Sequence, residues 1–430
     1  MRMSPERRAS HKMSDWAVFV GPSVLRSLVG AAAIGVLAPV GIQAQAQEAD
    51  AQMEKLEQQI EELQRQLEDL RDQVARQQTP PPPAAPADGG KPRFTLDVSG
   101  QIDQGMLVAD DGQDTNVFFV DNSNSSSRFR MVGEGAVTDD LTAGTNLEVQ
   151  IQPNASSQVS QNDQNLGSVG FTARKVEFYF NHERYGKLSV GQGDTASNNT
   201  AEVDLSGTSV VGYSSISDMA GGILFRDQDG VLSDTDVSDV FNNFDGLSRQ
   251  TRIRYDAPDF YGFSAATSAI SDRRWDAALT YAAEVFGAKL AAAGAYAYNY
   301  PDSSDIVDGS ISALLGDNAG LFEGVSLTFS AGSELFGESG RDNPVNYYGK
   351  LGYQFAPFPI GTTAFSADFG QTNNNVQNDD RAKTFGVQAV QSIDDVSTDL
   401  YLGYRYHKLD RDDADFKNIN AVLTGGRVKF

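Results

Sequence analysis

Two histidines and one run of aspartates are the residues beyond the first 46 that could do chemistry. His182 adjoins an expected turn, and neither His182 nor His407 lies near a nucleophile motif, so we expect no enzyme. The stretch DQDGVLSDTDVSD offers four carboxylates as cation ligands, at Asp227, Asp229, Asp234 and Asp236. Because it lacks the glutamate and the spacing of an EF-hand, we expect a solvated acidic loop, with no metal site and no cofactor.

The composition excludes several classes of protein. The 430 residues include no Cys, so disulfides and thiolate metal sites are excluded. The formal net charge of −24 argues against nucleic acid as a partner, because phosphates require a basic face. No apolar run of 18 residues follows the first 45, so no transmembrane helix is expected.

The first 92 residues read as three segments. Residues 1–46 have basic residues, then LVGAAAIGVLAPVGI, then a small-residue pattern, which is typical of a signal peptide cleaved after Ala46, with Met13 as an alternative start. Residues 48–78 predict a coiled coil, which the resemblance described below places in the periplasm; it is marginal alone and self-associates, and residues 79–92 predict a Pro/Gly-rich linker. The seam of the coil alternates spacings of 3 and 4: Met53, Leu56, Ile60, Leu63, Leu67, Leu70 and Val74.

From Arg93 the hydrophobic period becomes 2, which predicts strands with one apolar and one hydrophilic face. RFTLDVSGQID is an example of this alternation. Sixteen such segments begin near residues 94, 126, 141, 170, 186, 249, 260, 273, 286, 309, 321, 345, 360, 381, 396 and 417. Short connections alternate with long polar ones, an asymmetry that is typical of outer-membrane barrels.

A soluble β-sandwich is the rival all-β fold, because it shows the same alternation. Aromatic residues near the strand ends, such as Tyr185 and Tyr404, favour the interfacial girdles of a barrel. Charges in the middle of the opposite faces, such as Glu148 and Asp368, favour a water-filled lumen. We therefore predict an all-β fold over residues 93–430, a sixteen-stranded antiparallel transmembrane β-barrel preceded by a short α-helical coiled coil.

The chain ends in GGRVKF, with an aromatic last residue. Val428 and Phe430 share one face of the last strand while Arg427 and Lys429 share the other, so the terminal ring is expected to face lipid. A last strand ending in Phe resembles the assembly signal of Gram-negative outer-membrane proteins. The resemblance implies that the barrel assembly machinery reads Val428 and Phe430.

Two longer stretches resemble the general diffusion porins of Gram-negative bacteria. SSSRFRMVGEGAVTDDLTAGTNLEVQ is similar to their second and third strands, and RIRYDAPDFYGFSAATS to their sixth strand, turn and seventh strand. The resemblance covers about residues 93–430. It implies a homotrimer of sixteen-stranded barrels in the cell outer membrane, each with a third outer loop folded into the pore. Some relatives with substrate-selective pores also carry a periplasmic N-terminal coiled coil.

The resemblance places the inward loop within residues 195–248, with acids at Glu202, Asp204 and Asp218. Basic residues near the outer ends of strands two, four and six would form a wall opposite this loop: Arg128, Arg130, Lys175, Arg252 and Arg254. Alternation puts Arg174 on the face of Val176 and Phe178, so Lys175 is preferred unless a bulge intervenes. The alternative is that these bases are ordinary rim charges.

These features predict passive diffusion of small hydrophilic solutes and ions through a water-filled channel. The bulk charge suggests cation preference, whereas the wall is basic, so ion selectivity stays open. Two alternatives also stay open: a substrate-selective channel, for example for small organic anions, and a structural anchor whose coil tethers a periplasmic partner. Contacts with outer-membrane lipid and lipopolysaccharide are expected, directly or through divalent cations.

Overall fold

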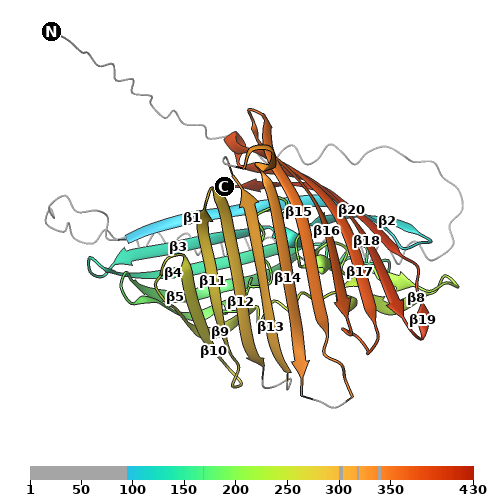
Figure 1. The fold of residues 1–430 in the computed structure, drawn as a ribbon, viewed down its shortest axis with the longest axis horizontal. Helices are drawn as coiled ribbons and strands as arrows, with labels where there is room; N and C mark the ends of the chain where they lie inside the picture. The colour runs from blue at the N-terminus through green and yellow to red at the C-terminus, as the bar shows by residue number, and fades with distance from the viewer. Residues whose placement is uncertain (1–93, 168, 300–303, 317–318, 338–339) are drawn as a thin grey trace, which may run out of the picture. The chain divides into compact units, whose positions relative to one another are not determined.

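The computed structural model describes residues 94–430 except 168, 300–303, 317–318 and 338–339. The expected signal peptide, coiled coil and linker lie outside the described residues, and Figure 1 draws them as a grey trace. The chain divides into two units, Met1–Gly89 and Gly90–Phe430. All of the described residues belong to the second unit.

The second unit is a closed antiparallel barrel whose wall has sixteen strands (Figure 1). Neighbours along the chain pair with one another, and β1 closes the barrel by pairing with β3 on one side and β20 on the other. The wall strands are β1 (Phe94–Asp110), β3 (Arg128–Ala136), β4 (Leu141–Pro153), β5 (Val169–His182), β6 (Gly186–Asp194), β9 (Arg249–Asp256), β10 (Phe263–Ile270), β11 (Trp275–Val285), β12 (Ala288–Asn299), β13 (Ser304–Leu315), β14 (Val325–Phe336), β15 (Val345–Phe358), β16 (Gly361–Asn373), β17 (Arg381–Ile393), β18 (Thr398–Arg411) and β20 (Ile419–Lys429).

Several shorter elements are not counted among the sixteen wall strands. Strands β2 (Thr115–Asp121) and β19 (Ala414–Asp415) extend the sheet, while β7 (Leu224–Arg226) and β8 (Leu232–Asp236) form a separate hairpin. The helix α2 (Val237–Val240) and the 3₁₀ helices η1 (Ser123–Ser125), η2 (Ile216–Asp218), η4 (Gly320–Phe322) and η5 (Asp394–Val396) complete the described elements. None of the helices in the described ranges is long and apolar enough to cross a membrane.

The sixteen expected strands are confirmed, and each begins within a few residues of its expected position. The largest difference is at β13, expected from residue 309 and observed from Ser304. Pairing with β12 continues through this polar start, where Asp305 accepts from Tyr296 of β12, and on the other side Ser304 bonds Glu334 of β14. Polar cross-strand bonds therefore extend the strand beyond its apolar pattern.

The two faces of the wall differ as the alternation predicts. On β14, Leu327 and Phe329 are about half exposed on the outside, whereas Thr328 between them is buried on the inside. Aromatic rings cluster near both strand ends, for example Trp275 with Tyr298 at one end and Phe355 with Phe365 at the other. Such paired belts are typical of proteins that meet two membrane interfaces.

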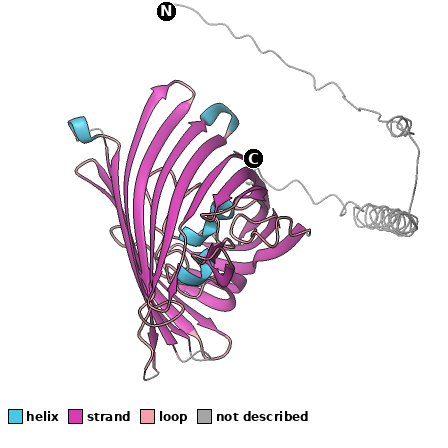
Figure 2. Cartoon of the chain, turned by 90° about the vertical axis from the view of Figure 1, so that its right-hand side faces the viewer, coloured by secondary structure: helices cyan, strands magenta, loops and turns pink. Residues whose placement is uncertain are grey.

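The long segment 195–248 lies inside the barrel and packs against its inner wall (Figure 2). The backbone amides of Val203 and Leu205 donate to the hydroxyls of Ser310 and Ser312 on β13, each at 2.9 Å. These hydroxyls satisfy loop amides that have no strand partner, which is what a buried loop requires. The inner faces of the later strands therefore hold the loop.

A hydrophobic core fills part of the lumen. The inner faces of β1, β2 and β20 supply Leu107, Phe118 and Leu423, which are essentially fully buried. The loop supplies the opposing side chains of this core, which include Val211, Met219, Ile223, Phe225, Val237 and Phe241. The expectation of a hydrophilic inner face throughout is therefore corrected, because here the loop replaces water as the neighbour of the wall.

Candidate functional site

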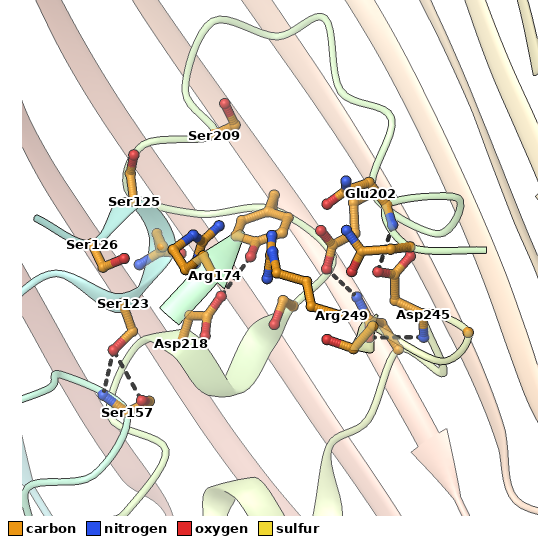
Figure 3. A pocket seen from close by; sticks show the side chains of 18 of the residues that line it. Ser123, Ser125, Ser126, Ser157, Arg174, Glu202, Ser209, Asp218, Asp245 and Arg249 are labelled. Atoms are coloured by element: carbon orange, nitrogen blue, oxygen red, sulfur yellow. Dashed lines mark hydrogen bonds between the residues drawn. The ribbon is translucent and has the colours of Figure 1, made fainter. Parts of the chain in front are cut away.

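A polar cavity of about 790 Å³ remains between the loop and the wall (Figure 3). Four wall strands each contribute an arginine to its lining: Arg128 of β3, Arg174 of β5, Arg249 of β9 and Arg427 of β20. The loop contributes the carboxylates of Glu202, Asp218 and Asp245. Cationic and anionic side chains thus approach the same space from different elements.

A bulge on β5 brings Arg174 to the cavity. Glu148 of β4 pairs with Lys175 and Val149 pairs with Ala173, so Arg174 is the extra residue. Its Nε donates to Glu148 at 2.6 Å. The preference for Lys175 over Arg174 is corrected, because strict alternation fails at a bulge. Lys175 bonds Asp194 instead and does not line the cavity.

A break between β2 and β3 adds hydroxyl groups to the cavity. The segment NSNSSS leaves the wall register as η1, which Asn122 caps by accepting from the amide of Asn124 at 3.1 Å. Ser125 Oγ accepts from Arg427 at 2.7 Å, and the carbonyl of Ser126 accepts from Arg128 at 3.1 Å. A run of Asn and Ser between two strands is a loop signal. That signal could have located this part of the lining, and sequence reasoning missed both the segment and Arg427.

The wall beside the cavity carries excess positive charge. Six bases share three carboxylates in pairs: Arg128 and Arg174 share Glu148, Lys175 and Arg249 share Asp194, and Arg427 and Lys429 share Asp399. Each carboxylate can neutralise one base, so these three groups carry three surplus positive charges, and Glu334 of β14, which also lines the cavity and bonds only Ser304, offsets one of them.

The other bases expected in the wall lie elsewhere. Arg252 is buried and bonds Glu177 at 2.6 Å, while Arg254 bonds Asp256 at 2.6 Å. Arg130 shares the inner face with Arg128 and is opposite Glu148 in register, but it is exposed and makes no ion pair with a described residue. These three arginines do not line the cavity, which corrects their expected place. Glu177 neutralises Arg252, and Asp256 neutralises Arg254.

The three loop acids at the cavity have neutral partners. Asp218 accepts from the hydroxyl of Tyr213 at 2.6 Å, and Glu202 accepts from the amide side chain of Asn243 at 2.9 Å. Asp245 accepts from the backbone amides of Asn199 and Ala201 at 2.7 and 2.9 Å. Within the described part of the chain, no base lies in ion-pair contact with these acids. They therefore present uncompensated negative charge.

Asp204 has a different role from the one expected. Its carboxylate bonds the Lys350 ammonium of β15 at 2.7 Å, and both side chains are almost completely buried. It lies between the loop and the wall, away from the cavity lining. The expectation that Asp204 belongs to the acidic face of the opening is wrong, because Lys350 neutralises it as an anchor of the loop.

Burial changes the ionisation of the cavity acids. It raises the pKa of Asp218 to about 6, since the surrounding protein disfavours the charged form. Burial, and then repulsion from Asp245, raises the pKa of Glu202 well above its usual range. Burial also raises the pKa of Asp245. The loop thus loses negative charge at a pH where free carboxylates stay ionised.

The aspartate run and the histidines have structural surroundings. Asp227 accepts from the amide of Val231 in a turn, and Asp236 caps α2. His182 contacts Asp140 at the β3–β4 turn, while His407 is buried beside Phe241. The described residues contain no group of three or more His, Asp or Glu that could hold a metal ion.

A comparison with protein families agrees with this architecture. The family profile for the Gram-negative porin matches residues 77–412. The chain belongs to the Gram-negative porin family. Membership supports an outer-membrane channel rather than an enzyme. No curated protein sequence matches this porin.

Solved structures show the same barrel. An anion-selective porin from Comamonas acidovorans is 15% identical, with a TM-score of 0.54 over 78% of this chain and 100% of that chain. OmpT of Vibrio cholerae in its trimer form is 12% identical, with a TM-score of 0.51 over 79% of this chain and 100% of that chain. At these identities the likeness concerns the fold, and it confirms the sixteen-stranded barrel.

Proposed function

We propose that this porin is a passive diffusion channel for small hydrophilic solutes and ions, and that segment 195–248 constricts it. The observation that carries this proposal is the 790 Å³ cavity in which Arg128, Arg174, Arg249 and Arg427 oppose uncompensated loop acids. The loop fills the other side of the lumen with an apolar core. Solutes that cross the barrel would therefore pass the charged cavity.

The local charges argue for a transverse field with an anion preference. The three surplus positive charges of the wall groups, one of them offset by Glu334, oppose Glu202, Asp218 and Asp245 on the loop. The raised pKa of Glu202 shifts the balance toward positive charge, and the pKa values of about 6 for Asp218 and Asp245 extend this shift as the pH falls below 7. Because a narrow passage responds to nearby charges more than to distant ones, this balance outweighs the bulk charge of −24.

A substrate-selective channel for small organic anions is the second candidate. Four arginines around one cavity favour it, together with the hydroxyls of Ser125 and Ser126, because guanidinium forks recognise carboxylates bidentately. Saturating current block by a small dicarboxylate would distinguish this candidate from a general channel. A channel without a binding site would give a block that stays proportional to concentration.

Electrical recording of the purified full chain in a planar bilayer tests the main proposal. We expect stepwise, ohmic conductance and a reversal potential on the anion side in a KCl gradient. Absence of conductance from correctly folded barrels would favour the structural anchor, whose barrel only holds a periplasmic coil.

The contacts of the C-terminus support its proposed role in assembly. The backbone of Phe430 exchanges two hydrogen bonds with Gly100, at 2.8 and 3.0 Å, and completes the closure between the first and last strands. The side chains of Val428 and Phe430 are 47% and 67% exposed on the outside. We propose that the assembly machinery reads these two side chains before closure.

The parts of the chain outside the described residues complete the proposal. Residues 1–46 would direct export, residues 48–78 would form a periplasmic coiled coil and residues 79–92 would link it to the barrel. We propose a homotrimer, in which three such coils would be tethered close to one another and pair.

A further inference from the structure

Three arginines of the polar cavity keep hydrogen-bond donors free, and two of them are Arg174 and Arg249. Both terminal nitrogens of Arg249 lack a hydrogen-bond partner among the described residues, because only its Nε contacts Asp194, at 2.9 Å. Arg174 uses its Nε for Glu148 and its Nη1 for Gln150, at 2.6 and 2.9 Å, which leaves Nη2. These nitrogens remain available to a solute in the cavity.

Arg128 is the third arginine with a free donor. Its Nε donates to the carbonyl of Ser126 at 3.1 Å, whereas its Nη1 is 3.7 Å from Glu148, beyond hydrogen-bond distance. Arg128 is close enough to Arg174 and Arg249 for their charges to repel its own. An anion held among these three guanidinium groups would relieve that repulsion.

The surroundings of the arginines differ on their two sides. Figure 3 shows Arg174 and Arg249 in the middle of the cavity, with serine hydroxyls on one side and carboxylates on the other. Both groups belong to the lining of the same cavity. We call them the hydroxyl end, formed by Ser123, Ser125, Ser126 and Ser209, and the acidic end, formed by Glu202 and Asp245.

The hydroxyl end offers hydrogen-bonding groups that carry no charge. Ser125 Oγ accepts from Gln101 at 2.9 Å and from Arg427 at 2.7 Å, and its own hydrogen has no acceptor among the described residues. The Ser209 hydroxyl is exposed and makes no hydrogen bond within the described part of the chain. A solute with hydroxyl groups would find both a donor and an acceptor at this end.

We propose that the cavity binds phosphate monoesters of small polyols, with the phosphate among the three arginines and the hydroxylated body at the hydroxyl end. The inference rests on the proposed function, because only a solute that enters the lumen reaches this cavity. The three terminal oxygens of a phosphate monoester point in different directions, so guanidinium groups from β3, β5 and β9 can each serve one of them. A carboxylate has two oxygens in one plane, and a single guanidinium fork satisfies both.

The charges around the cavity also fit such a solute. The wall groups carry three surplus positive charges and Glu334 offsets one, which leaves two. A phosphate monoester carries nearly two negative charges at pH 7. A diacid long enough to span the cavity would place its second anionic group against the acidic end. A solute with one anionic head and one neutral, hydroxylated body avoids that repulsion.

Binding of glycerol 3-phosphate to the purified full chain tests the proposal, measured by isothermal titration calorimetry in detergent. Propyl phosphate keeps the head group and the chain length but lacks both hydroxyls. Glycerate replaces the phosphate by a carboxylate, and inorganic phosphate lacks the body. We expect each of these three compounds to bind about fivefold more weakly than glycerol 3-phosphate, because each forms fewer hydrogen bonds.

Two substitutions test the two parts of the site separately. R249Q removes the free fork and should weaken binding of glycerol 3-phosphate about tenfold. R381Q is the matched control and should bind as the wild type does, because Arg381 is exposed on the outer surface of β17 while its neighbour Ala382 is buried in the lumen. S209A should weaken binding of glycerol 3-phosphate about threefold and leave binding of inorganic phosphate unchanged.

Several results would overturn the proposal. These are binding of propyl phosphate, glycerate or inorganic phosphate as tight as that of glycerol 3-phosphate, equal losses in R249Q and R381Q, and an unchanged affinity in S209A. Conductance in KCl is recorded on the same preparations. A barrel that conducts with anion preference but does not discriminate among these ligands would contradict only this inference. A barrel without conductance that still prefers glycerol 3-phosphate would contradict the proposed function and leave this inference intact.

Discussion

The two sides of the lumen differ in what faces the wall. Over the outer part of β1 and β20, and on β2, the inner residues are apolar, as at Leu107 and Leu423, because the loop packs against them. Along β3, β5 and β9 the inner residues are charged, as at Arg128 and Arg174, because they border the cavity. Apart from the bulge at Arg174, alternation decides which residues point inward. The path of one loop decides whether they meet protein or water.

The loop likewise has two faces with different partners for its acids. On the filled side, Asp204 is buried against Lys350. On the cavity side, Glu202 and Asp218 are held by neutral groups. An acid of the loop therefore anchors it where a buried base is present. Where no base is in contact, the acid keeps its negative charge and contributes to the electric field in the cavity.

Breaking the Asp204–Lys350 ion pair, which anchors the loop, should have the largest effect on the channel. K350M leaves the Asp204 carboxylate buried without its counter-ion, with only the backbone amide of Ser206 as a donor, at a cost of about 3–5 kcal/mol. The barrel wall keeps its strand pairing, so we expect the loop to detach locally, with larger, noisier conductance and new protease cleavage within residues 195–248. The double variant K350M/D204L should restore quiet channels. Unchanged current and cleavage in K350M would show that the filled side does not depend on this pair.

Removing a cavity arginine should change selectivity without releasing the loop. R427Q removes one of the three surplus wall charges, so the reversal potential in a KCl gradient should move toward the cation side. R381Q is the matched control, because it removes the same charge from the outer surface. A shift of equal size in both variants would mean that the bulk charge, not the cavity, sets selectivity.

Acidification should increase the net positive charge around the cavity, because the loop acids become neutral while the wall arginines stay charged. The pKa of Asp218 is raised to about 6, so the carboxylate is ionised at pH 7 and becomes protonated as the pH falls through that value. The loop then loses negative charge while the arginines keep theirs, and anion preference should increase from pH 7 to pH 5. D218N should weaken this pH dependence. A reversal potential that is the same at both pH values would contradict the proposed ionisation of the loop.

Deleting Phe430 should have the smallest effect on stability, because its ring is mostly exposed and buries little area. We nevertheless expect less barrel in the outer membrane, measured by the amount of heat-resistant folded protein in membrane fractions. F430Y keeps an aromatic end and is the control. If outer-membrane levels stayed normal after the deletion, the proposed assembly signal would be wrong.

The barrel was predictable because sixteen strands repeat one physical pattern, and each apolar face must meet lipid. The site was less predictable, because single-residue events decide it. Arg174 reaches the lumen through a bulge that alternation cannot reveal. Asp204 and Glu202 are both acids of the same loop, and nothing nearby in the sequence distinguishes them. Asp204 is neutralised by Lys350, which lies almost 150 residues away in the chain. The inner face of β20 carries a signal in Ile419, Ala421 and Leu423, since an apolar inward row predicts a packed neighbour.

The reversal potential of single channels in a KCl gradient at pH 7 shows whether permeating ions pass the charged cavity. We expect an open, ohmic pore with a modest anion preference that R174Q and R427Q together reduce or reverse. Strong cation preference in the wild type, unchanged by those two substitutions, would contradict the proposal that the charged cavity is the passage.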